Sequence, residues 1–248
     1  MAIAVSNFRP VAGLKPGTLY RSDDPWRFPD TSSVLLRDHG INRICDLRSP
    51  KEASKRPTRT PAQTIHIPFD QPGELAVLSC LFGRTGEDRF RELFRNFYHQ
   101  IVFEQTGKIR QIVELVANAE NHPVLIHCNA GKDRTGLSVA IVQLLAGVPY
   151  DVVRADYLRT NELFQDRLDR FIRRLRRITL YQVSEQRMRT IAMAHAEYLD
   201  QVHAKILKDH GSVESYSGLD QATFKGLRTN LGLSGPSSSS VLPRSQDD

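Results

Sequence analysis

The chain has 248 residues, of which 40% are hydrophobic and 25% are charged. This length suits one α/β domain with a sizeable core, and no apolar run approaches the roughly 20 residues of a membrane span. Residues 1–5 lack the features of a signal peptide, and three cysteines are too few for a disulfide framework. We therefore expect a cytoplasmic protein without stable membrane insertion. The net charge of +6 permits several kinds of anionic partner and selects none.

The first half of the chain alternates short apolar runs with turn residues. These runs predict three strands, at 18–22, 41–47 and 64–69, with a helix over 31–39 between the first two. A basic, proline-rich loop follows at 51–61. Glycines interrupt residues 70–90, and this stretch is predicted to be loop.

The second half is mostly helical in its pattern. Helical spacing over about 88–118 is followed by a strand at 124–126, and further helices are predicted at 137–145, 149–162, 163–181, 188–207 and, as two short pieces, within 211–232. The order predicts an α/β fold with a mainly parallel sheet of four or five strands flanked by helices. We expect one domain over 1–234, a helical, lid-like excursion at 160–195, and a disordered, serine-rich tail at 235–248.

The stretch from His127 to Gly136 carries the clearest chemistry. It reads as strand, tight loop and helix, so Cys128 leaves the strand just before a helix N-terminus. Backbone N–H groups and the helix dipole there favour a thiolate and bind anions. Arg134 offers a planar fork to two phosphate oxygens. The predicted phosphate cradle consists of Asn129, Ala130, Gly131, Lys132 and Thr135.

Three other interpretations of this loop fit less well. Cys128 could be a structural cysteine at a strand end, but the Gly, Arg and Thr residues around it would then have no reason for their spacing. A nucleotide-binding P-loop needs a glycine where Ile126 stands and a hydroxyl where Asp133 stands. A sulfur-transferring, rhodanese-like loop is shorter than the spacing between Cys128 and Arg134.

The loop resembles the signature of the cysteine-dependent protein tyrosine phosphatase superfamily, on the motif His127-Cys128-x-x-Gly131-Lys132-Asp133-Arg134-Thr135-Gly136. Its Gly-Lys-Asp-Arg-Thr-Gly form is similar to a bacterial and fungal branch. Other stretches follow the order of that branch: Asn7-Phe8-Arg9, Leu19-Tyr20-Arg21-Ser22, Asp46-Leu47-Arg48-Ser49 and 155–161. One departure is Pro10, where the branch usually has an aspartate. The resemblance implies a tyrosine-phosphatase-like fold and a cysteinyl-phosphate intermediate, with no metal and no cofactor.

Three aspartates compete for the role of general acid. Asp133 lies within the loop and is favoured by its position. Asp70 follows a predicted strand, where the branch carries a functionally implicated aspartate, and it is the alternative. Asp46 ends a buried strand and is expected to be structural.

Other charged residues around the loop have open roles. Lys132 either adds charge for a substrate with more than one phosphate or is simply solvated. The ring of His127 is expected to hydrogen-bond backbone and hold the loop. Arg21 and Arg48 either flank the pocket or are ordinary arginines. The arginines of 167–177 form either the wet face of a helix or a basic lid.

The loop thus predicts a phosphoric monoester hydrolase, and the resemblance implies phosphotyrosine or phosphoinositide-type substrates, as for a tyrosine or dual-specificity phosphatase. A phosphatase of a small phosphorylated metabolite is the alternative. A phosphate-binding module without turnover would need a damaged loop, and Cys128, Arg134 and Thr135 are all present. The expected partner is the phosphorylated substrate, and no nucleic acid is expected.

Overall fold

A five-stranded sheet forms the centre of the protein. The computed structural model describes residues 5–27, 29–82, 86–178, 180 and 182–232, and the predicted tail at 235–248 lies outside them. The strands lie in the order β1 (Arg9–Pro10), β2 (Leu19–Ser22), β5 (Val124–His127), β3 (Arg43–Asp46) and β4 (Gln63–His66). Only β1 runs antiparallel to its neighbour. The predicted mainly parallel sheet is therefore confirmed.

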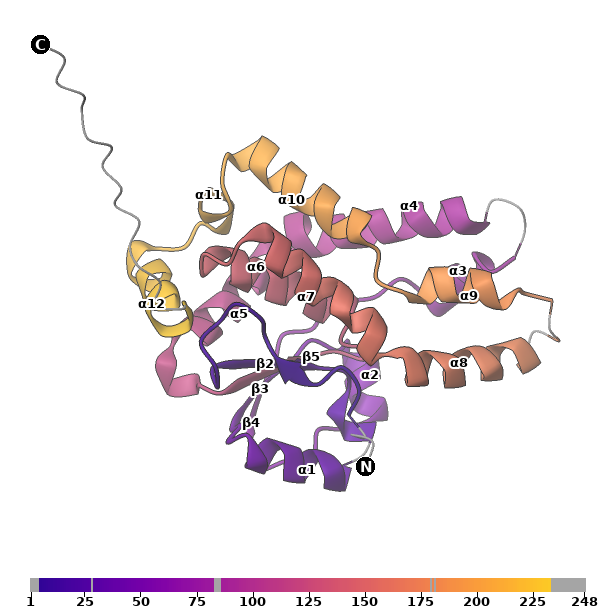
Figure 1. Cartoon of the computed structure of the whole chain (residues 1–248), viewed down its shortest axis with the longest axis horizontal. Coiled ribbons are helices and arrows are strands. Elements are labelled where there is room, and N and C mark those ends of the chain that lie inside the picture. The colour runs from indigo at the N-terminus through magenta and orange to yellow at the C-terminus, as the bar shows by residue number, and fades with distance from the viewer. Residues whose placement is uncertain (1–4, 28, 83–85, 179, 181, 233–248) are drawn as a thin grey trace, which may run out of the picture.

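Helices cover both faces of this sheet and also extend beyond it (Figure 1). Along the chain they are α1 (Pro29–Asp38), α2 (Pro50–Lys55), α3 (Glu74–Ser79), α4 (Gly86–His99), α5 (Thr106–Ala117), α6 (Asp133–Leu145), α7 (Tyr150–Leu163), α8 (Gln165–Ile178), α9 (Glu185–Ala192), α10 (Ala196–His210), α11 (Val213–Ser217) and α12 (Gln221–Leu231). A single π-helical turn, Gln100–Glu104, joins α4 to the linker before α5. Among the described residues no helix combines the length and the apolar character needed to cross a bilayer.

The core is divided by the sheet because successive strand residues face opposite sides. Ile44 and Leu125 pack with Leu36 of α1 in a small cluster on one face. Cys45 and Ile126, one position further along, belong to the large core that includes α5 and α6 on the other face. Both strands are therefore buried on both faces, which explains their uninterrupted apolar sequence.

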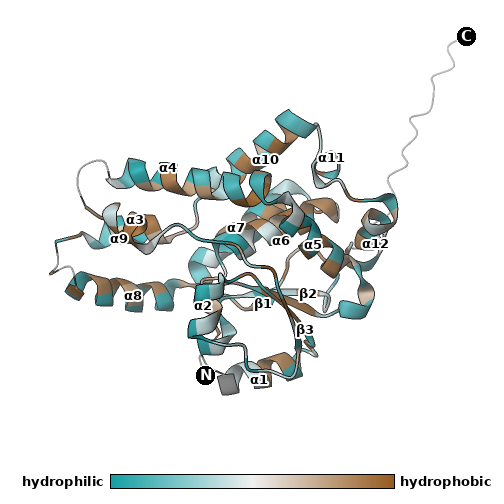
Figure 2. Cartoon of the chain, turned by 180° about the vertical axis from the view of Figure 1, so that it is seen from behind, coloured by the Kyte–Doolittle hydropathy of each residue, from teal (hydrophilic) through white to brown (hydrophobic). Residues whose placement is uncertain are grey.

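Helices α3, α4, α8 and α9 form a projection beyond one end of the sheet (Figure 1). In α8 the apolar residues Leu168, Ile172 and Leu175 are buried, and Figure 2 shows the helix striped with polar and apolar residues. Three predictions fail: the loop predicted at 51–61 begins with α2, whose start is a capping box, and the other two failures lie in this projection and just after it. Residues 70–90 contain α3 and the start of α4, and the helix predicted over 188–207 is interrupted between α9 and α10.

The interruption has a visible cause in the contacts of Asn161. Its side-chain oxygen accepts a hydrogen bond from the Ala194 N–H at 2.7 Å, and its Nδ2 donates to the Ala194 carbonyl at 2.9 Å. A distant amide thus satisfies the backbone groups that a continuous helix would pair internally. Periodicity alone does not reveal such a partner.

Candidate active site

Cys128 lies between the end of β5 and the first turn of α6, at the floor of a cavity. Its side chain is only 2% exposed, and the backbone N–H of Gly131 donates to Cys128 Sγ at 3.2 Å. The N-terminus of α6 brings further positive potential to the same point. The sulfur of Cys128 therefore lies where backbone N–H groups and a helix N-terminus stabilise negative charge.

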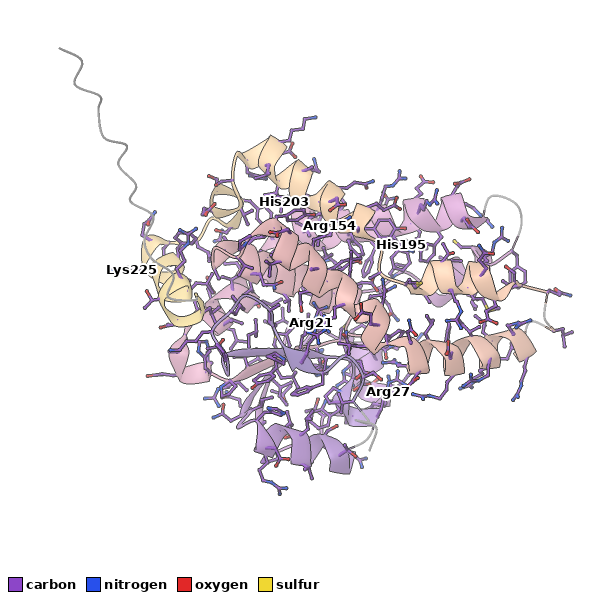
Figure 3. The ribbon with its side chains drawn as sticks, viewed as in Figure 1. Arg21, Arg27, Arg154, His195, His203 and Lys225 are labelled. Atoms are coloured by element: carbon purple, nitrogen blue, oxygen red, sulfur yellow. The ribbon has the colours of Figure 1, made fainter. Side chains whose placement is uncertain are left out.

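The curl of the loop depends on Gly131. This residue has a φ of +66°, and a Cβ atom there would collide with the carbonyl of Ser22. The Gly131 carbonyl in turn accepts hydrogen bonds from Asn7 Nδ2 at 2.8 Å and Arg21 Nη2 at 3.0 Å. Arg21 also pairs with Asp156 at 2.8 Å, and Figure 3 shows it between β2 and α7. Arg21 therefore links the Gly131 carbonyl of the loop to Asp156 of α7 and fixes the position of the loop.

Arg134 is held by one edge of its guanidinium. Nη1 and Nη2 donate to the two carboxylate oxygens of Glu52 at 2.6 and 2.9 Å, and Nη1 also donates to the carbonyls of Leu47 and Phe69. Among the described residues no hydrogen bond uses Nε. The edge formed by Nε and Nη2 therefore remains for a ligand in the cavity that Arg134 lines. Two parallel N–H groups of this kind match two phosphate oxygens.

Glu52 is fixed by the start of α2. The Ser49 N–H donates to Glu52 Oε2 at 2.9 Å, and the Glu52 N–H donates to Ser49 Oγ at 3.3 Å, which is a capping box. Burial alone would raise the pKa of Glu52, but the hydrogen bonds from Arg134 outweigh it and lower that pKa. Burial likewise opposes the charge of Arg134, yet Cys128 and Glu52 raise the pKa of its guanidinium. Both groups therefore stay ionised at neutral pH.

Asp133 opens α6 and lines the cavity beside Cys128. Its Oδ1 accepts a hydrogen bond from the hydroxyl of Tyr98 at 2.7 Å, and that hydroxyl also contacts the hydroxyl of Tyr157 at 2.6 Å. Burial raises the pKa of Tyr98 well above its usual value, so the tyrosine stays neutral and acts as a donor. Asp70 is exposed and does not line the cavity, although its neighbours Gln71 and Pro72 do.

Lys132 connects the loop to the end of α9. Its Nζ donates to the carbonyls of Ala192 and Met193 at 3.0 and 3.2 Å and lies 3.5 Å from Asp133 Oδ1. The ammonium also lies over the ring of Phe94, 5.5 Å from its centroid. Lys132 is thus a buried side chain with fixed protein partners and is not a solvated one.

His127, Asp46 and Arg48 form a buried group beneath the loop. Asp46 pairs with Arg48 at 2.6 Å and lies 3.7 Å from His127 Nε2, while His127 Nδ1 contacts the Cys128 carbonyl at 3.3 Å. Burial opposes the charge of Asp46, but His127 and Arg48 outweigh it and lower the pKa of that carboxyl. Burial lowers the pKa of His127. None of the three lines the cavity, so their geometry suits structural support.

The cavity above Cys128 has a volume of about 460 Å³ and largely apolar walls. The phosphate loop supplies its floor through Cys128 to Ala130 and Lys132 to Arg134. Aliphatic and aromatic side chains from α3, α4, α8 and the residue between α7 and α8 surround it, and these include Val77, Leu78, Phe94, Phe97, Phe164, Leu168, Phe171 and Leu175. The site therefore combines an anion-binding floor with walls that suit an apolar or aromatic group.

Sequence comparison decides the family. The model of the tyrosine phosphatase family matches residues 3–232. The chain belongs to this family. It is 32% identical to the triple specificity protein phosphatase PtpB of Mycobacterium tuberculosis, over 90% of this chain and 95% of that protein. It is 26% identical to a putative tyrosine-protein phosphatase of Cupriavidus necator, over 86% and 80%. A segment covering 23% of the chain is 40% identical to 26% of an inositol diphosphatase of Arabidopsis thaliana.

As a member of the family, the chain is a phosphatase.

The sequence analysis did not identify three residues of this site, Glu52, Tyr98 and Asp156. Glu52 and Tyr98 gave no signal, since each is one polar residue on a short or amphipathic helix. Asp156 was noticed only as part of a family stretch. It accepts hydrogen bonds from both Arg9 and Arg21, at 3.0 and 2.8 Å, which makes it the anchor behind the phosphate loop.

Proposed function

We propose that this phosphatase hydrolyses phosphomonoesters through a cysteinyl-phosphate intermediate. The observation that carries the proposal is the convergence of three groups on one cavity: the Cys128 sulfur, the unpaired edge of Arg134 and the Asp133 carboxyl. A phosphoryl group on the loop would lie against the thiolate and the fork together. The N–H groups of the loop and Arg134 bind its equatorial oxygens, where charge develops in the transition state.

The reaction proceeds in two displacements. In the first, Cys128 Sγ forms a bond to phosphorus as the bond to the leaving oxygen breaks, and the Asp133 carboxylic acid gives that oxygen a proton. In the second, the Asp133 carboxylate takes a proton from water, which attacks phosphorus and releases the sulfur as thiolate and the phosphate as product. Tyr98 orients Asp133 through both steps.

The substrate proposed is a phosphate ester whose leaving group fits the apolar walls, and phosphotyrosine meets this description. The phosphoinositide-type substrates of our sequence prediction are retained, because one relative is named a triple specificity phosphatase and another an inositol diphosphatase. A small, wholly polar metabolite would leave the apolar walls without a partner. Helices α8 and α9 supply Phe171 and Ala192 to the wall, and we propose that residues 160–195 act as a cover for bound substrate.

Cysteine substitution tests the mechanism. Cys128→Ser should abolish hydrolysis of an aryl phosphate, whereas Cys80→Ser, at a buried cysteine outside the site, should retain it. Mass spectrometry of quenched Asp133→Asn enzyme should find phosphate attached to Cys128. Turnover by Cys128→Ser at the wild-type rate would refute the proposal.

A paired substitution tests the acid. Asp133→Asn should lose far more activity on an alkyl phosphate than on an aryl phosphate with a good leaving group, since only a poor leaving group needs protonation. Asp70→Asn, which changes an exposed carboxyl, should lower both rates equally or not at all. The opposite pattern would assign the acid to Asp70.

A further inference from the structure

Three arginines meet at one neutral atom next to the nucleophile. Asn129 follows Cys128 in the loop, and its Oδ1 accepts hydrogen bonds from Arg27 Nη2 at 2.7 Å, Arg56 Nη2 at 3.0 Å and Arg167 Nη2 at 3.5 Å. Arg167 Nη1 also donates to the Asn129 carbonyl at 3.0 Å. An amide oxygen has two lone pairs, so three guanidinium donors exceed what it can satisfy.

These arginines come from three separate parts of the chain. Arg27 ends a 3₁₀ turn after β2, Arg56 follows α2, and Arg167 lies in the first turn of α8. Figure 3 shows Arg27 in the region between α2 and the start of α8. A cluster of like charges assembled from distant segments costs Coulomb energy unless something offsets it. Arginines that serve only to keep a surface soluble would not need to meet at one atom.

The acidic residues nearby compensate the cluster only in part. Asp24 pairs with Arg56 but also with Arg48, and Asp23 pairs with Arg167. Burial raises the pKa of Asp23 to about 7, so its charge is incomplete at neutral pH. The Nε of Arg27 is buried and has no hydrogen-bond partner. Burial, together with Arg167 and Arg56, lowers the pKa of Arg27 to about 10.

The position of the cluster fixes what it can bind. Asn129 and Arg167 line the same cavity as Cys128, and consecutive Cα atoms are only about 3.8 Å apart. Arg27 and Arg56 do not line the cavity themselves, but both donate to Oδ1 of Asn129, a residue that does belong to its lining. We propose that Arg27, Arg56 and Arg167 form a second anion subsite, which binds another phosphate group of the substrate whose first phosphate lies on Cys128. This inference rests on the proposed function and deepens it. Guanidinium groups bind phosphate oxygens more strongly than a neutral amide, so the second phosphate replaces Asn129 as their acceptor.

Lys132 is less suited to this role than the three arginines. Two of the hydrogen bonds of its ammonium go to carbonyls at the end of α9, and Asp133 compensates its charge. The charge for a second phosphate, which the sequence suggested at Lys132, is therefore better supplied by the three arginines at Asn129.

The test compares substrates with one and with two phosphates. Steady-state kinetics would use phenyl phosphate, a soluble inositol bisphosphate, and the matching inositol lipid in neutral vesicles. Arg27→Gln and Arg56→Gln keep an N–H donor for Asn129 and remove the charge. Each should raise KM for the soluble bisphosphate by about tenfold more than KM for phenyl phosphate, the size of one charge-assisted hydrogen bond. Arg37→Gln removes an equal charge from an exposed site on α1 and should change neither.

The outcomes separate the subsite from the activity. If the variants raise KM for the soluble and the vesicle bisphosphate more than KM for phenyl phosphate, the subsite binds the second phosphate group itself. If they raise KM for the vesicle substrate alone, the arginines attract the lipid surface and the proposal is overturned. Equal changes for phenyl phosphate and bisphosphate would also overturn it, since the arginines would then only shape the loop. Wild-type enzyme that hydrolyses none of the three substrates would instead refute the proposed function. Arg27→Lys, which restores the charge, should recover part of the lost discrimination.

Discussion

Glu52→Gln should show how much catalysis depends on the orientation of Arg134, because the arginine is kept and its ion-pair partner is removed. Glu52 neutralises a guanidinium whose side chain is 5% exposed, while its own side chain is 9% exposed. Removing one partner of a buried ion pair costs about 3–5 kcal/mol, because the other charge stays uncompensated. Glutamine retains one acceptor oxygen, so we expect a loss of about 2–3 kcal/mol in the free energy of unfolding. Urea denaturation followed by fluorescence would measure it.

The same substitution should weaken catalysis beyond the loss of stability. Without a bidentate partner, Arg134 can rotate and present its fork at other angles to the transition state. We expect kcat on phenyl phosphate to fall about 10- to 100-fold, which corresponds to about 1.4–2.7 kcal/mol of transition-state stabilisation. KM should change less, because the cavity walls and the loop N–H groups still bind the ground state.

Ser49→Ala is the matched control for this prediction. It removes the cap of α2 but leaves the bond between Glu52 and Arg134, and loss of such a cap costs about 1 kcal/mol. Its kcat should therefore remain close to that of the wild type. If Glu52→Gln keeps full kcat and loses only as much stability as Ser49→Ala, then Glu52 is a helix cap and does not position Arg134.

Three more changes have distinct readouts. Tyr98→Phe should slow hydrolysis of an alkyl phosphate more than that of an aryl phosphate, because Asp133 loses its hydrogen-bond donor. The same change leaves the buried Tyr157 hydroxyl unpaired and should lower the free energy of unfolding, measured by thermal denaturation, by about 1–3 kcal/mol. Lys132→Met should speed hydrogen exchange in α9, whose last carbonyl loses its partner; unchanged exchange would contradict the link. Asp23→Asn should gain stability over the wild type as pH rises from about 4 to 7, by at most about 4 kcal/mol. In that window the folded wild type, with the pKa of Asp23 near 7, holds a proton that the unfolded chain has released; a difference constant with pH would contradict this.

The sequence predicted the centre of the site because that centre is contiguous. Strand, loop and helix follow one another from 124 to 145, so Cys128 and Arg134 come together through local backbone geometry. The parallel sheet was predictable for a similar reason, since each buried strand has its own apolar run and turn signals.

The supporting residues could not be predicted because their contacts link distant segments. Glu52 and Arg134 are 82 residues apart, and Tyr98 and Asp133 are 35 apart. One glutamate at a helix start and one tyrosine on an amphipathic helix fit cap and core roles equally well. The break between α9 and α10 has the same origin, since Asn161 and Lys132 satisfy its backbone from elsewhere. At this break, tertiary hydrogen bonds override the local helix propensity.

Two groups of cationic residues surround the loop, and they have different surroundings. We infer that catalysis and substrate choice depend on different residues in this enzyme. Arg134 and Lys132 have fixed protein acceptors, so their orientation is set before any substrate arrives. The arginines at Asn129 share one overloaded amide oxygen, although Asp24 and Asp23 also pair with Arg56 and Arg167, and a second phosphate of the substrate would give all three a charged acceptor. Changes at Glu52 should therefore appear mainly in kcat for every substrate, whereas changes at Arg27 should appear in KM for substrates that carry a second phosphate. An enzyme built this way can alter its preference at the cluster without disturbing the chemistry on Cys128.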